Sequence, residues 1–74
     1  MGYLRNMIDE LSRRADDSDL IALLATSRQG RLYNAVLARE LRDVAGALRR
    51  ELEVRRLALL RQSNDMRIGS SNDN

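Results

Sequence analysis

Apolar residues recur every three or four positions along most of the chain, which is the spacing of one face of an α-helix. The first segment with this pattern, residues 3–15, predicts a short amphipathic helix. Its apolar positions are Leu4, Met7, Ile8, Leu11 and Ala15. The pattern returns in two further segments, so the chain is predicted to be all-α.

The acidic run "DDSD" at residues 16–19 is predicted to separate the first helix from a second one at residues 18–28. Asp17 or Ser18 is expected to cap the second helix, because a short oxygen-bearing side chain accepts a hydrogen bond from the free amides at a helix N-terminus. Residues 20–24, "LIALL", are apolar almost all round this helix and are therefore expected to be buried. Gly30 is predicted to end the helix in a left-handed conformation.

A long helix is predicted over residues 31–62, because this segment contains no proline, one glycine and good helix formers throughout. At 1.5 Å per residue it is about 45 Å long. We expect a helical hairpin in which the two short helices pack on the first half of the long helix. The other half is expected to be buried between subunits of an oligomeric bundle or ring. Residues 1–62 form the predicted helical domain, and residues 63–74 form a disordered polar tail.

One face of the long helix carries an apolar stripe that is predicted to be the oligomer interface. Its members are Leu37, Leu41, Val44, Leu48, Leu52 and Leu59. A seven-residue repeat through this stripe is imperfect, since one choice of register places Arg55 in the interface and another places Glu51 there. A straight bundle or a ring therefore fits the stripe better than a long coiled coil.

Arginines lie along the edge of this stripe, and two interpretations of them stay open. In the first, Arg42, Arg49 and Arg56 form ion pairs with Glu40 and Glu51 of a partner helix, as charges that flank an apolar interface usually do. In the second they bind DNA phosphates, which the planar guanidinium suits. The candidate DNA-binding residues are Arg28, Arg31, Arg42, Arg49 and Arg56.

The amino-acid composition limits the kinds of site that the chain can form. The absence of cysteine and histidine excludes disulfides and ordinary zinc sites, and removes the commonest general base and thiol nucleophile. We therefore expect a non-enzymatic protein without cofactor or metal. Thirteen arginines against eleven acidic residues leave a net charge of +2, which alone does not argue for nucleic acid. The two aromatic residues, Tyr3 and Tyr33, are expected at the edges of the core.

No apolar run approaches the roughly 18 residues that span a bilayer; the longest, "LIALLA", has six. The sequence therefore predicts a cytoplasmic protein that does not bind membranes.

The segment "LARELRDVAGALRREL" resembles a helix-turn-helix motif. That motif needs a turn, and here the turn positions read Arg42, Asp43 and Val44, without the glycine that the motif uses. Helix propensity predicts that the helix continues across these residues. An observed break there would favour a transcriptional regulator.

A second resemblance covers about residues 4–53. The segment "LRNMIDELSRR" followed by "AVLARELRDVAGALRRELE" resembles the helical hairpin of small terminase subunits from phages of GC-rich hosts. In that family, helical subunits form rings that recognise viral DNA and pass it to the large, ATP-hydrolysing subunit. The resemblance implies a homo-oligomer in the host cytoplasm, with duplex DNA and a large protein as partners. The alternatives are the helix-turn-helix regulator and a structural or adaptor bundle.

Overall fold

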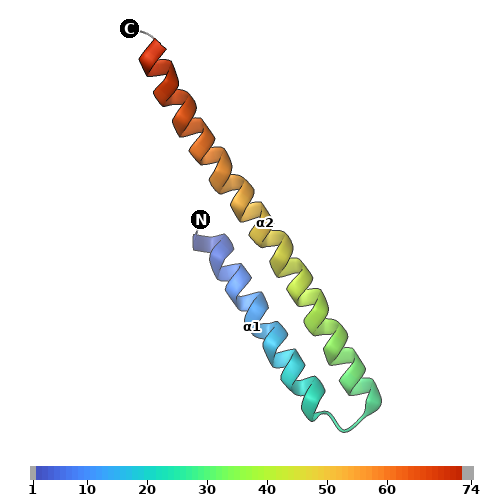
Figure 1. Cartoon of the computed structure of the whole chain (residues 1–74). Helices are drawn as coiled ribbons and strands as arrows, with labels where there is room; N and C mark the ends of the chain where they lie inside the picture. Colours follow the sequence, from blue (N-terminus) through green and yellow to red (C-terminus); the bar gives the residue numbers. More distant parts are fainter. Residues whose placement is uncertain (1, 73–74) are drawn as a thin grey trace.

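The chain forms two antiparallel α-helices joined by a short link (Figure 1). The computed structural model describes the backbone of residues 2–72 and the side chains of residues 2–64. Helix α1 spans Gly2–Leu24 and helix α2 spans Arg28–Asn72. The predicted all-α helical hairpin is confirmed. The molecule measures 72 × 16 × 12 Å because the second half of α2 extends beyond the N-terminal end of α1 (Figure 1).

The predicted break between two short helices is wrong, because α1 continues through the acidic run at residues 16–19. Ser18 does not cap a second helix but is buried against α2. Asp16 and Asp19 instead form ion pairs with Arg42 of α2. Aspartate lowers helix propensity by only a few tenths of a kcal/mol per residue, and these contacts between the helices override that preference.

The link before the long helix lies earlier than predicted, at residues 25–27 rather than 29–30. Ser27 precedes α2, and its Oγ accepts a hydrogen bond of 2.9 Å from the backbone N–H of Gly30, which is the geometry of an N-cap. Gly30 therefore lies in the first turn of α2 rather than in a left-handed stop, and no glycine in the described part of the chain has a positive φ. A Cβ at Gly30 would lie 2.9 Å from Ser27 Oγ, so glycine leaves room for the cap.

Helix α2 ends at Asn72, beyond the predicted end at residue 62. The separation of the chain into a domain of residues 1–62 and a polar tail of residues 63–74 stays a prediction, and residues 73 and 74 lie outside the described residues. The helix is unbroken across Arg42–Ala45. This segment therefore does not form the turn that a helix-turn-helix motif requires.

The two helices meet along a seam of small and medium-sized side chains. On both helices most of the buried and half-buried positions follow one another in steps of four and three residues, the spacing typical of a coiled coil. The α1 seam positions are Leu4, Ile8, Leu11, Ala15, Ser18 and Ala22, followed by Ala25 in the link, and the α2 positions are Asn34, Ala38, Leu41, Ala45, Leu48 and Leu52. Since three of the four buried apolar residues are alanines, the helices approach closely with little bulk between them.

Gly46 lies beside the seam, but close packing does not require it. A Cβ built there meets only Arg50 Nη1, at an ordinary contact distance of 3.6 Å. Gly46→Ala is therefore expected to raise the free energy of unfolding by about 1 kcal/mol through helix propensity. Urea denaturation followed by circular dichroism measures this change. A decrease in stability would show that α1 lies closer to Gly46 than the structure indicates.

Candidate functional site

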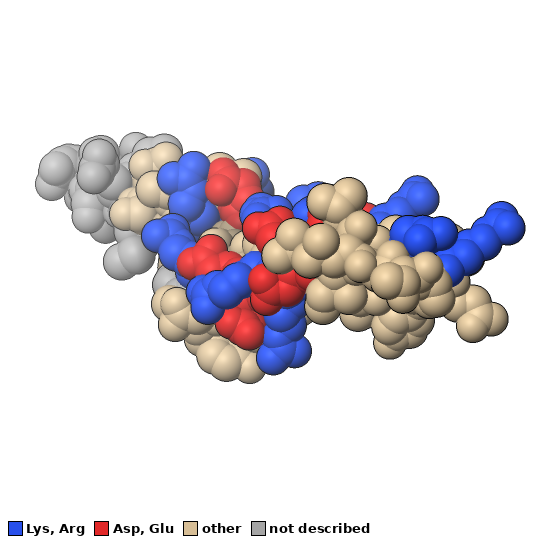
Figure 2. Space-filling view, turned by 90° about the horizontal axis from the view of Figure 1, so that it is seen from below, with Lys and Arg blue, Asp and Glu red and all other residues tan. Residues whose placement is uncertain are grey.

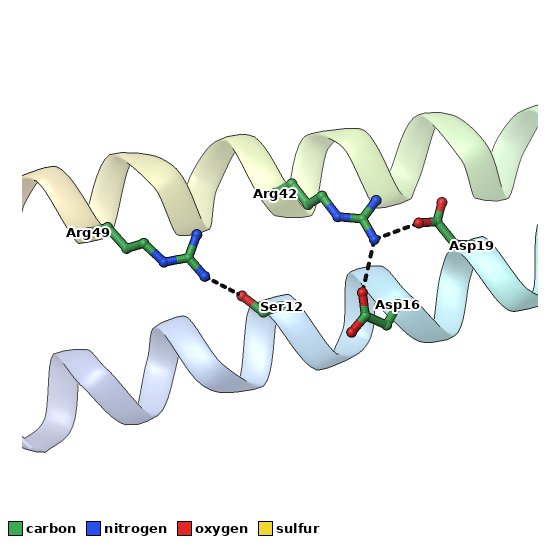
Figure 3. Close-up of polar contacts among 5 residues, drawn as sticks. All are labelled: Ser12, Asp16, Asp19, Arg42 and Arg49. Carbon is green, nitrogen blue, oxygen red and sulfur yellow. Dashed lines mark hydrogen bonds and ion pairs between the residues drawn. The ribbon is translucent and has the colours of Figure 1, made fainter.

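Arg42, Arg49 and Arg56 form a row beside the seam, and the first two contact α1 (Figure 3). Arg42 Nη2 donates to Asp16 Oδ1 at 2.9 Å and also pairs with Asp19. One heptad further along α2, Arg49 Nη2 donates to the hydroxyl of Ser12 at 2.9 Å. The hydrogen bonds that Arg42 donates to Asp19 and to Asp16 raise the pKa of Arg42, so this guanidinium remains charged. Arg42 therefore forms ion pairs between helices, as in the first interpretation, but within one chain, whereas Arg49 adds a hydrogen bond to a neutral hydroxyl.

Arg56, the third member of the row, lies where α2 extends past α1 and pairs on its own helix. Its Nη2 donates to Glu53 Oε1 at 3.0 Å and its Nε to Oε2 at 3.2 Å. This two-point contact lowers the pKa of the Glu53 carboxyl below its ordinary value. Of the two glutamates expected to pair across subunits, Glu51 accepts a hydrogen bond from Arg55 at 3.0 Å, and Glu40 is exposed.

The Glu53–Arg56 pair is expected to make the stability of the protein depend on pH. Because the folded-state pKa of Glu53 is depressed, the pair contributes to stability above pH 4.5, and this contribution is lost as the pH falls through the folded pKa. Arg56→Gln should return the pKa of Glu53 toward 4.5. The measurement is a carbon-detected NMR titration of the Glu53 carboxyl. Arg42→Gln serves as the control, since Arg42 does not contact Glu53. Equal Glu53 titration curves in the parent and in Arg56→Gln would contradict the assignment.

The other two predicted DNA-binding residues flank the turn of the hairpin. Arg31 Nη1 donates to the carbonyls of Ala25 and Thr26 at 3.2 and 3.4 Å, and thereby supplies partners for the C-terminal end of α1. Arg28 is exposed in the first turn of α2 and has no ion pair among the described side chains. The five predicted arginines thus do not form one free cationic surface, since four of them already have polar partners.

The apolar stripe predicted as an oligomer interface is divided by the hairpin. Leu41, Leu48 and Leu52 are half-buried seam positions. Val44 and Leu59 remain about half exposed, the first on the flank of the seam and the second beyond the end of α1. The seam follows the register through residues 41, 45, 48 and 52, and α1 ends before that register reaches Arg55. Helix α1 of the same chain thus occupies part of the surface predicted for another subunit.

Large apolar side chains outside the seam gather at the turn of the hairpin. We call this set the tip patch; it comprises Leu20, Ile21, Leu23, Leu24, Leu32, Tyr33 and Val36, all exposed. Residues 20–24 were expected to be buried, yet Leu23 is 79% and Leu24 70% exposed. No acidic residue occurs in residues 20–39. Figure 2 shows this end of the molecule as uncharged surface with arginines.

A second apolar set lies on the part of α2 that α1 does not cover. This overhang carries Val54, Leu57, Leu59 and Leu60, each at least half exposed. Tyr3, which was expected at the edge of the core, is exposed near the N-terminal end of α1. Soluble monomers seldom expose large contiguous apolar surfaces without using them to bind something. The tip patch and the overhang are therefore the candidate functional surfaces.

No match was found when the chain was compared with models of protein families, with curated proteins and with solved structures. Function must therefore be inferred from the chemistry of the described residues. Among those residues no group of three or more acidic side chains has a metal-binding arrangement. Neither described helix is long and apolar enough to cross a membrane.

Sequence reasoning missed Ser12, Asp16 and Asp19 as partners of the arginines. A signal was present: Ser12 and Asp19 are seven residues apart, as are Arg42 and Arg49. Matching spacings of one heptad place such side chains at facing edge positions of an antiparallel helix pair. The signal was hidden because residues 16–19 were interpreted as a helix end.

Proposed function

We propose that this chain is a non-enzymatic helical module that acts by associating with other helical protein surfaces, first of all with further copies of itself. The observation that carries this proposal is the number of large apolar side chains that the hairpin leaves exposed, in the tip patch and on the overhang. A structural or adaptor role follows from the same surfaces. A large protein partner, as in terminases, stays part of this proposal.

Energetics supports the same conclusion. A chain of this size buries little apolar surface, and its only large buried apolar side chain among the described residues is Ile8. Each exposed leucine or valine that a partner covers contributes about 25 cal/mol per Å² of apolar surface removed from water. Association therefore supplies stabilisation that a hairpin with one uncovered half-helix lacks.

Sedimentation velocity over a wide range of protein concentration tests the proposal. We expect species heavier than the 8.4 kDa monomer, with the mean mass rising with concentration. Leu24→Ser with Leu32→Ser in the tip patch should shift the distribution toward the monomer, because both side chains lose apolar surface that a second copy would cover. A monomer at every concentration, with full helicity, would contradict self-association.

A DNA-associated assembly, as in small terminase subunits, is a second candidate. It is favoured by the charge of the described part of α2, where nine arginines and four acidic residues in residues 28–64 leave +5. Of these arginines, Arg39, Arg50 and Arg61 are exposed and have no ion pair among the described side chains. Such residues are free to contact phosphates, which the paired Arg42 and Arg49 are not.

Two triple variants test DNA binding. Replacing Arg39, Arg50 and Arg61 by glutamine should weaken binding to a duplex by roughly tenfold or more and reduce the slope of log K against log salt by about two to three. The matched variant, with Arg42, Arg49 and Arg56 replaced, should mainly destabilise the hairpin. Fluorescence anisotropy with a labelled duplex measures both effects. If the parent has no affinity at low salt, the DNA candidate is wrong.

A further inference from the structure

We propose that copies of this chain associate side by side, with the outer face of α1 of one copy packed on the outer face of α2 of the next. This inference rests on the proposed self-association and names the surfaces that carry it. The outer faces are those directed away from the seam, and each forms a stripe of exposed residues. The α1 outer stripe is Asp9, Arg13, Asp17, Leu20 and Leu24, and the α2 outer stripe is Leu32, Val36, Arg39, Asp43 and Arg50.

The two stripes match in order and in spacing. Read from the turn of the hairpin, the first four positions follow one another in steps of four, three and four residues on both helices. Read in that direction, α1 presents Leu24, Leu20, Asp17 and Arg13, and α2 presents Leu32, Val36, Arg39 and Asp43. When the two turns lie at the same end, apolar residues therefore meet apolar residues and each charge meets its opposite.

The match continues toward the other end of the hairpin. One step further along α1 lies Asp9, and Arg50 of α2 lies about 4.5 Å along the axis from the position opposite, within reach of an arginine side chain. Asp9, Asp17, Arg39, Asp43 and Arg50 have no ion pair among the described side chains. Arg13 has only an exposed contact of 3.5 Å with Glu10. These charges are thus available to another copy.

The two helices also differ in net charge. Helix α1 carries three arginines and five acidic residues, a net charge of −2, whereas the described part of α2, residues 28–64, carries +5. Contact between α1 and α2 of different copies joins opposite charges. A symmetric dimer through two α2 outer faces would join two basic helices and leave the acidic α1 face uncovered. Electrostatics therefore favours the α1–α2 contact.

This contact is heterologous, because the two copies contribute different surfaces. Each added hairpin leaves one α1 face and one α2 face free at the ends of the row. The row therefore either closes into a ring or grows. All copies have the same orientation, so every tip patch lies at one end of the assembly and every overhang at the other.

A charge exchange tests the inference by sedimentation velocity. Asp17→Arg and Arg39→Glu should each weaken association by about fivefold or more, since each places like charges together. The double variant restores the pair with reversed sign and should recover most of the parent association. Glu40→Arg is the control: it adds the same charge as Asp17→Arg at an exposed position outside both stripes, and it should leave association within about twofold of the parent. Circular dichroism confirms that each variant is folded.

The outcomes separate this inference from the proposed function. Suppose that the parent associates but that neither single change weakens association, or that the double variant does not restore it. Either result overturns the α1–α2 contact and leaves self-association standing. An assembly that stops at a dimer and responds to Arg50→Glu but not to Asp17→Arg identifies the symmetric α2 contact and also overturns the inference. A parent that is monomeric throughout overturns both.

Discussion

Ile8→Ala is expected to lower the free energy of unfolding by about 2–4 kcal/mol, the loss usual for a buried isoleucine cut back to alanine. Ile8 is 4% exposed, and the other buried apolar residues of the described chain are alanines. A domain of this size has a total stability of roughly 4–11 kcal/mol. Loss of this one side chain therefore removes a large share of what holds α1 on α2. Urea denaturation at a concentration at which the protein is monomeric measures the change.

Ile21→Ala is the matched control for this prediction. It makes the same substitution in the same helix, but Ile21 is 52% exposed and belongs to the tip patch. We expect the monomer to lose less than about 1 kcal/mol, since a half-exposed side chain loses little burial. Equal losses at the two positions would show that the seam does not lie where the structure places it.

Much of the fold is predictable from the spacing of apolar residues. The period of three to four residues identifies the helices, and the absence of proline or a turn signal between Arg31 and Gln62 predicts one long helix. A long helix with short partners can bury its apolar face only in a hairpin or an assembly. That part of the prediction needs no knowledge of which residues meet.

The error at residues 16–19 has a physical cause. Aspartate and serine favour helix ends, because their side chains can replace the missing backbone partners there. Local preference of this kind amounts to a few tenths of a kcal/mol and is reversed when the same side chains face another helix. Ser18 at the seam and Asp19 opposite Arg42 are contacts between residues far apart in the sequence. They become visible only when α1 and α2 are placed in register.

The sequence predicted the kind of contact that the arginines make, but not the residues that they contact. Ion pairs between helices were one interpretation of the flanking arginines, and Arg42 forms such pairs within the chain. Their partners were sought in Glu40 and Glu51 because those glutamates flank the same stripe. The exposed tip could not be foreseen, since an apolar run such as residues 20–24 normally indicates burial. In a two-helix protein, however, each helix has only one neighbour, and the sides directed away from it stay exposed.

Ala45→Leu tests the close approach of the two helices. Ala45 is 0% exposed, and the order of the seam positions from the turn places it opposite Leu11 of α1. Leucine and alanine have similar helix propensities, so the substitution changes packing more than helix formation. A leucine side chain inserted here forces the helices apart and costs about 1–3 kcal/mol. The same displacement lengthens the contacts of Arg42 with Asp16 and Asp19, which depend on the present separation.

Ala47→Leu distinguishes this packing effect from a general effect of a larger side chain. Ala47 is exposed on α2, two residues from Ala45, so a leucine there meets no part of α1. Thermal unfolding of the monomer should show a clear loss of stability for Ala45→Leu and almost none for Ala47→Leu. If Ala45→Leu instead stabilises the hairpin, the seam contains space that the larger side chain fills. In that case the alanines do not mark the closest approach of the two helices.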